Sequence, residues 1–332
     1  MKHIKWFLGA AAFALLLSQP TAAANGAREA MAQWYHSVAP SLLPFMALMP
    51  LLTCEEALTA YEALLGWGMR TFFALPGSAA AALVVALLAG SPAGSHAVRR
   101  ASARGDMDCG QLRRLALACA GLSPGFLITG IGSTLLGNAA MGHLLLRTQA
   151  AVQLTLLFLL RFVIRDDRKV PVSEDRSGKD GSMAASTLAV LSVGGWMALF
   201  GAMAGVLRNA SGGEGTIPFL CVLEVSTGVH WVGAQKADVL WKLVRISWLA
   251  GFGGLCVAMQ NMAALKDCGV RKGEYLLVRL AAGALSAGVT WAQVKMKSIH
   301  TFFAGPQILP AACLGLCAAL VPVVLHFKRT EV

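Results

Sequence analysis

Long apolar runs, separated by short polar segments, follow one another along most of this chain. They cover residues 38–54, 72–88, 115–137, 144–164, 182–206, 216–231, 244–265, 274–292 and 301–326. Many approach the roughly 20 residues that a helix needs to span a bilayer. Because ten-residue alternating segments are absent from the sequence, the pattern predicts an all-α polytopic membrane protein. We expect about eight transmembrane helices plus two re-entrant hairpins.

A charged segment at residues 165–183, expected to be a cytoplasmic linker, divides the chain into two halves of similar length. Residues 38–164 and 184–332 are then two repeats. Residues 1–37 combine an apolar helix with an amphipathic helix. The apolar helix is either transmembrane or signal-like, because residues 21–24 resemble a signal-peptidase site. We expect it to be retained.

The basic residues constrain the topology. The chain carries 28 Lys and Arg against 17 Asp and Glu, a formal net charge of +11. They collect in short loops, as in the cytoplasmic loops of membrane proteins, so we expect no nucleic-acid partner. The loops at 99–114, 165–179 and 266–272 share one side only if residues 72–95 enter and leave on the same face. Residues 216–231 must do the same from the opposite face.

The two halves then share one plan. Each has a re-entrant hairpin, turning at 90–94 or 224–228, and then a glycine-containing helix break, at 123–125 or 251–254. Inverted repeats whose broken helices meet at the bilayer midplane are typical of secondary transporters. The N-termini of such half-helices favour an anionic ligand.

Glu224 is the most unusual polar residue, because it lies in a strongly apolar region. A charged carboxylate at the centre of a lone membrane helix costs roughly 2.5 kcal/mol or more. Glu224 is therefore a candidate proton carrier, sodium ligand or substrate contact, with H+ or Na+ as coupling ion and no other cofactor. The alternative is a structural carboxyl bonded to backbone N–H groups of the turn. Ser226, Thr227 and Gly228 complete this turn.

Further candidates lie at the other turn and at the two breaks. Gln260 and Asn261 follow the second break by about two turns. Arg279 lies in an apolar helix, where it either balances a carboxylate or snorkels to the surface, and Arg147 is a similar candidate. The expected substrate- or ion-binding residues are Ser91, Gly94, Ser123, Gly125, Glu224, Ser226, Thr227, Gly228, Gly253, Gly254, Gln260 and Asn261.

The sequence carries no pattern for ATP hydrolysis, catalysis or metal binding. No Gly-x-x-x-x-Gly-Lys-Ser/Thr, Ser-His-Asp or His-Glu-x-x-His arrangement stands out. The eight cysteines form no Cys-x-x-Cys pair and are expected to be buried apolar residues. His96, His143 and His230 lack metal spacing and are expected to be structural. We expect neither an enzyme nor a metal site.

Several motifs together resemble the sporulation integral membrane proteins of the nucleoside-recognition (gate) domain family. They are VAPSLLPF at 38–45, LPG at 75–77, GSPAG at 90–94, SPGF at 123–126, Gly132, LGN at 136–138, LEVSTG at 223–228, GGLCVAMQ at 253–260 and LVRL at 277–280. The resemblance covers nearly the whole chain. It implies a fold like that of concentrative nucleoside transporters, with two gate repeats, and transport of dipicolinate across a forespore membrane. The chain departs from the family near His96, where a lysine-containing helix is usual, and before Ser123, where asparagine is usual.

Three functions follow as expectations. The first is a secondary transporter or exporter of a small organic anion, with dipicolinate as the expected cargo, in a forespore-associated membrane of an endospore-forming bacterium. The second is a transporter of nucleosides or other neutral solutes. The third is a non-transporting sporulation membrane scaffold. Expected partners are the small organic anion, membrane lipid and either a second copy of the chain or other sporulation membrane proteins.

Overall fold

The chain folds into helices. The computed structural model describes residues 2–52, 54–166, 168, 183–210, 217–266 and 268–297, and no strand forms among them. The first half contains α1 (Lys2–Ser18), α2 (Pro20–Gln33), the π-helical η1 (Trp34–Val38), α3 (Ala39–Leu52), α4 (Glu55–Phe73), η2 (Gly77–Ala79), α5 (Ala80–Ala89), α6 (Ala93–Ser102), α7 (Cys109–Ala118), the π-helical η3 (Phe126–Leu135) and α8 (Ala139–Val163). The second half contains α9 (Met183–Ala210), α10 (Ile217–Leu223), α11 (Val225–Ala234), α12 (Val239–Phe252), α13 (Gly254–Ala264) and α14 (Lys272–Lys297). The predicted all-α class is confirmed for these residues.

Four of the described helical stretches are long and apolar enough to cross a membrane. They are Ala139–Val163, Thr187–Ala210, Val239–Ala264 and Lys272–Met296. A fifth candidate is the pair Glu55–Phe73 and Gly77–Ala89, which is bent by 106°. These helices indicate a multi-pass protein. The eight transmembrane helices expected are not confirmed among the described residues, where the apolar runs at 72–88 and 216–231 form shorter, interrupted helices. The run at 301–326 lies outside the described residues, as does most of the linker at 165–183.

In the first half, α5 and α6 form the predicted helical hairpin, with its turn at residues 90–92. Its two ends lie together, because Ser78 at the start of the first arm donates a hydrogen bond to Asp106, just beyond the second arm. The predicted hairpin shape is therefore present, whereas its entry and exit on one face of the membrane stay a prediction. The returning arm extends to Ser102, so His96 and Arg99 lie on a helix and not in a loop.

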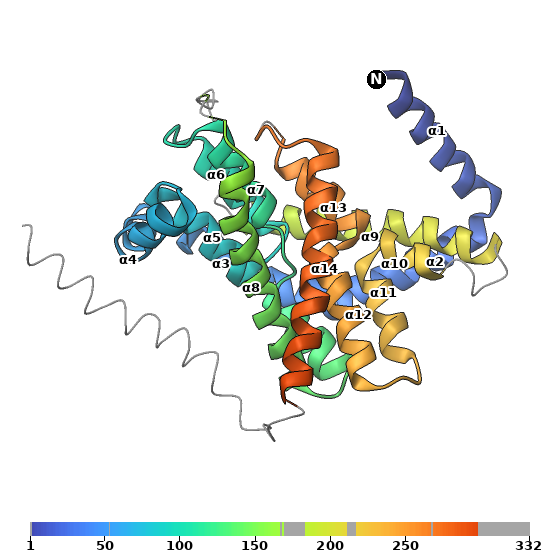
Figure 1. Cartoon of the computed structure of the whole chain (residues 1–332). Helices are drawn as coiled ribbons and strands as arrows, with labels where there is room; N and C mark the ends of the chain where they lie inside the picture. Colours follow the sequence, from blue (N-terminus) through green and yellow to red (C-terminus); the bar gives the residue numbers. More distant parts are fainter. Residues whose placement is uncertain are drawn as a thin grey trace, which may run out of the picture.

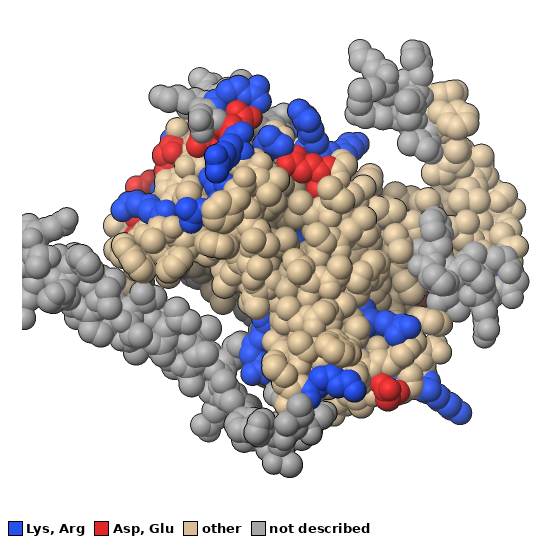
Figure 2. All heavy atoms as spheres, in the orientation of Figure 1, with Lys and Arg blue, Asp and Glu red and all other residues tan. Residues whose placement is uncertain are grey.

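The basic loops of the two halves meet at the end of the molecule where this hairpin opens. The Arg113 guanidinium lies 2.8 Å from the Glu274 carboxylate and 3.9 Å from that of Asp166. The backbone N–H of Cys109 also donates to the carbonyl of Arg168 at 2.8 Å. Figure 2 shows charged side chains gathered near α6 and α7 and at the opposite end, with a broad uncharged surface between them. This distribution suits a protein whose middle faces lipid.

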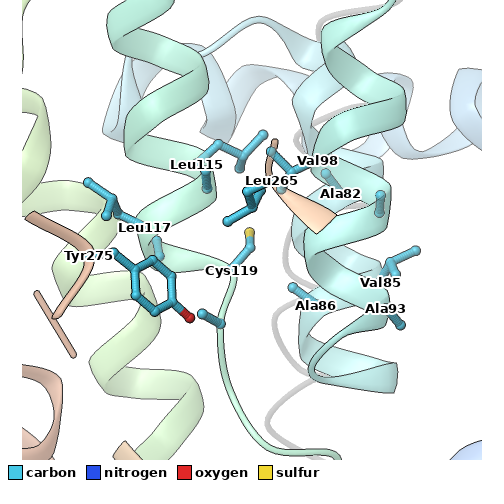
Figure 3. Close-up of a cluster of buried hydrophobic side chains, with 14 of the residues drawn as sticks. Ala82, Val85, Ala86, Ala93, Val98, Leu115, Leu117, Cys119, Leu265 and Tyr275 are labelled. Carbon is cyan, nitrogen blue, oxygen red and sulfur yellow. The ribbon is translucent and has the colours of Figure 1, made fainter. Parts of the chain in front are cut away.

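The hairpin packs into the larger of the hydrophobic cores. Figure 3 shows Ala82 and Ala86 of α5 on one side of this cluster and Leu115 and Leu117 of α7 on the other, with Leu265 between them and Tyr275 near Leu117. Small residues dominate the hairpin arms, and they let neighbouring backbones approach closely, as in many membrane helix interfaces. The core therefore holds the hairpin turn deep inside the molecule.

Three long helices form a second layer. α14 runs beside α8 and packs closely on α12. Polar groups are paired across these contacts: Thr290 Oγ1 donates to Ser247 Oγ at 2.8 Å, and Ser247 Oγ lies 3.0 Å from the carbonyl of Ser286. Thr148 of α8 joins them at 3.3 Å from Thr290. Such interhelical hydrogen bonds stabilise helices where no water is present.

α2 and α9 run side by side, across the direction of α8 and α14 (Figure 1). A Cβ atom on Gly26 would lie 2.2 Å from the carbonyl oxygen of Gly201, and one on Gly205 would lie 2.4 Å from that of Ala22. The amphipathic helix expected within residues 1–37 corresponds to α2, whose small face is buried against α9, and the π-helical η1 continues it.

In the second half, α10 and α11 are joined by Glu224 alone, the residue that leaves helical geometry. A Cβ atom on Gly233 of α11 would lie 2.6 Å from Leu135, which precedes α8. The second arm therefore ends at the end of the molecule opposite to the charged loops. Residues 211–216 before α10 lie outside the described residues, and the inverted-repeat relation stays a prediction.

Candidate functional site

The turn of the first hairpin packs against the first helix break. The break spans residues 119–123, slightly earlier than the predicted 123–125, because Pro124 and Gly125 are already helical. The backbone N–H of Ser91 donates to the carbonyl of Gly121 at 2.6 Å. Gly90 has φ +69°, and a Cβ there would lie 2.5 Å from the nitrogen of Ser123. Turn and break therefore touch through their backbones.

Two glutamines of α8 face this break. The side-chain amide of Gln149 bonds both backbone groups of Leu122, accepting from the N–H at 2.9 Å and donating to the carbonyl at 2.8 Å. Gln153 lies one helical turn further on and is 3% exposed, yet neither its Nε2 nor its Oε1 has a partner among the described residues. Its Nε2 lies 2.2 Å from the position of a Cβ on Gly121. A buried amide with an unused donor and acceptor is costly and suits a bound ligand or water.

Asn261 joins the second half of the chain to the first hairpin. Its Oδ1 accepts from Ser95 Oγ at 3.1 Å, and its Nδ2 lies 3.0 Å from Ser91 Oγ and 2.8 Å from the hydroxyl of Tyr275. Asn261 is fully buried. This network connects α6, α13 and α14 at the level of the hairpin turn.

Arg279 lies one helical turn beyond Tyr275 on α14, and its guanidinium points inward. Its Nη1 donates to the carbonyl of Ala120, and the residue is 3% exposed. It therefore does not snorkel to the surface. Among the described residues its Nε has no hydrogen-bond partner, and no acidic side chain forms an ion pair with it. A buried cation without a counter-ion costs several kcal/mol, so the arrangement favours an anion beside it.

Glu224 caps the N-terminus of α11. One carboxylate oxygen accepts from the backbone N–H of Ser226 at 3.0 Å, and the other from that of Thr227 at 2.6 Å. Glu224 itself is 2% exposed. This is the geometry of the structural alternative: a carboxylate stabilised by free N–H groups and by the positive end of a helix.

The second break lies directly against this cap. Gly253 and Gly254 have φ +84° and +75°, which separates α12 from α13. A Cβ on Gly254 would lie 3.1 Å from the nitrogen of Val225. Each hairpin turn thus packs on the break of its own half.

The remaining predicted residues have different neighbours. Gln260 is buried but donates to Cys256 Sγ at 3.2 Å on its own helix. Gly228 and Gly94 permit close packing within their hairpins, and Ser123 Oγ accepts from the N–H of Phe126 at 3.2 Å. Gly125 packs against Ser41 of α3, away from the Asn261 network.

Ser95, Tyr275, Gln149 and Gln153 were not among the predicted site residues. The two glutamines had a signal: they lie four residues apart in an apolar run, so they share one helix face. Arg147 is half-buried in the first half of α8. The other arginine of this helix, Arg161, lies in its last turn. Among the described residues no group of three or more His, Cys, Asp or Glu could hold a metal ion.

The chain is similar to a bacterial sporulation membrane protein. It is 24% identical to the sporulation integral membrane protein YlbJ of Bacillus subtilis (strain 168), over 337 aligned positions that cover 88% of this chain and 82% of that protein. No protein-family model matches the chain. No solved structure matches it either. The similarity and the apolar helices together indicate a multi-pass membrane protein related to sporulation.

Proposed function

We propose that this protein is a secondary transporter or exporter of a small organic anion, with dipicolinate as the first candidate, in a forespore-associated membrane. The observation that supports this most directly is Arg279. Its charge is buried at a helix break, where it bonds Ala120 while the unused amide of Gln153 faces the next residue, Gly121, and no described acidic residue forms an ion pair with it. A carboxylate that accepts from the guanidinium would remove most of that cost.

The geometry also explains how such a site would be enclosed. The Ser91 turn and Asn261 lie at the same break, so the Arg279 region is bounded by the first hairpin and by α13. Movement of either element would open a path to the site. Alternating access in secondary transporters relies on motions of this kind around a fixed central site.

The test is uptake of labelled dipicolinate into proteoliposomes, with and without an imposed proton or sodium gradient. Arg279→Gln is expected to lower uptake about tenfold or more, since a hydrogen bond to a charged group is worth about 1.5–3 kcal/mol. Arg279→Lys keeps the positive charge and is expected to retain part of the uptake. Arg147→Gln is the matched control and is expected to transport normally. Wild-type protein that moves no dipicolinate under any gradient would refute the proposal.

A neutral cargo is the second candidate, because Gln149, Gln153, Ser91 and Asn261 are all uncharged hydrogen-bonding groups. Competition between labelled dipicolinate and unlabelled nucleosides separates the two cargoes. A scaffold role predicts a third pattern, in which Arg279→Gln leaves sporulation intact while changes in the segment 165–179 do not.

A further inference from the structure

A separate cavity of about 260 Å³ lies where α2 and α9 meet α10 and α11. Thr227 and His230, one helical turn apart on α11, line it together with Gln33 of α2. Most of the lining is apolar. The volume is enough for several water molecules, each of which occupies about 30 Å³ in the liquid. The cavity can therefore hold water beside Cys221 and Thr227, which lie on either side of the Glu224 turn in the sequence.

Some polar groups of this cavity have hydrogen-bond or ion-pair partners among the described residues, and others do not. The Glu29 carboxylate and the Arg208 guanidinium pair with each other at 2.8 Å, and both are partly exposed. Gln33 Oε1 is buried and has no donor among the described residues. His230 makes no hydrogen bond to any residue that the structure describes, although it is half-buried. Polar atoms in this state are suited to hydrogen bonds with water.

We propose that this cavity is a proton-binding site, with His230 as the group that takes up the proton, and that it couples the transport proposed above to a proton gradient. The coupling role rests on that proposed function, whereas the proton-binding role does not. The unprotonated ring nitrogen of His230 accepts H+ from cavity water and becomes an imidazolium. Histidine is the residue whose charge ordinarily changes between about pH 5 and pH 8.

Charged and titratable groups from several surrounding elements act on His230, and they include Lys242 of α12, which donates to the carbonyl of Gly233 on α11 at 2.8 Å. Glu29 of α2 and the Glu224 carboxylate at the start of α11 attract an imidazolium, and Glu224 lies within electrostatic range of His230. Arg208 of α9 opposes it, and Cys221 of α10 is uncharged as a thiol. Protonation thus changes the forces across the joint between α10 and α11.

That joint is in contact with the second helix break. The Glu224 oxygens hold the first N–H groups of α11, and Gly254 packs on Val225. Because both Glu224 oxygens are already bonded, His230 is better placed than Glu224 to change its protonation state without losing the cap. A proton on His230 can in this way bias the position of the hairpin relative to the break.

Two measurements on the full-length protein test the inference. In proteoliposomes at zero membrane potential, an inward proton gradient is expected to stimulate dipicolinate uptake by wild type and by the control His143→Gln. His230→Gln is expected to lose this stimulation while keeping gradient-free exchange of labelled for unlabelled dipicolinate. Stimulation that persists in His230→Gln, or that is missing from wild type, overturns the coupling role.

The second measurement does not depend on transport. The imidazole nitrogens of labelled histidines are titrated by NMR in nanodiscs, and the His230 signal is the one missing from His230→Gln. Its conversion to imidazolium between about pH 5 and pH 8 supports the proton site. A His230 signal that stays neutral throughout overturns it. If wild type moves no dipicolinate but His230 titrates, the proposed function fails and the proton site stands.

Discussion

Asn261 and Ser91 are 170 positions apart in the sequence, yet the Asn261 amide lies 3.0 Å from the Ser91 hydroxyl. The contact joins the helix after the second break to the turn of the first hairpin. It is accompanied by bonds from Asn261 to Ser95 and Tyr275. One buried side chain therefore connects the two halves of the chain at the candidate site.

Replacing Asn261 with Leu is expected to destabilise the protein strongly. Ser91, Ser95 and Tyr275 would each lose a partner inside the protein, at about 1–3 kcal/mol for each polar group left unsatisfied. Thermal unfolding in detergent micelles measures the loss. Gln260→Leu is the matched control, because Gln260 bonds only weakly to a sulfur on its own helix. Equal losses for the two variants would contradict the role of Asn261.

Replacing Glu224 with Gln is expected to impair transport without removing the protein from the membrane. A glutamine has one acceptor oxygen where Glu224 uses two, so one bond of the α11 cap is lost, at about 1 kcal/mol. Glu224→Asn also removes the charge, but asparagine caps helix N-termini well. This variant is therefore expected to retain more transport than Glu224→Gln. If the Asn variant is stable and inserted in the membrane but does not transport, the negative charge of Glu224, and not the cap, is what transport requires.

Gly254→Ala is expected to cost more stability and more transport than Gly253→Ala. Both glycines have positive φ, which costs an alanine about 1 kcal/mol. At Gly254 the added methyl group would also lie 3.1 Å from Val225, whereas at Gly253 the nearest neighbour is 3.6 Å away. Unfolding temperature and uptake rate check the difference, and a larger effect at Gly253 would refute the packing of break against cap.

Asp166 is expected to make stability fall in acid. Hydrogen bonding to Arg168, with further attraction to Arg113, lowers the pKa of this carboxyl from its ordinary 3.8 to about 2. Because the folded pKa is the lower one, the contribution is complete above the ordinary pKa and is lost as the pH falls towards 2. The difference in unfolding temperature between wild type and Asp166→Asn is therefore expected to be constant above about pH 5 and to shrink below it. The effect is small because Arg168 is exposed.

The apolar runs and the basic loops were sufficient to predict the helical membrane class and the first hairpin. Burial of long apolar segments and the clustering of charge are properties of composition along the chain, so they can be read without contacts. The glycines at 90 and 253–254 likewise marked real turns, since positive φ is difficult for other residues. The number of membrane-spanning helices stays a prediction, because an apolar run of hairpin length and one of spanning length differ little in composition.

The partners of the polar residues were decided by the tertiary structure. The sequence by itself identified Glu224, Asn261 and Arg279 as unusual for an apolar environment, and it could do so because buried polar groups are costly wherever they lie. It could not show that Glu224 is held by two backbone N–H groups, that Asn261 reaches Ser91, or that Arg279 points to Ala120. Hydrogen bonds act over about 3 Å, and which groups come that close depends on how distant segments pack.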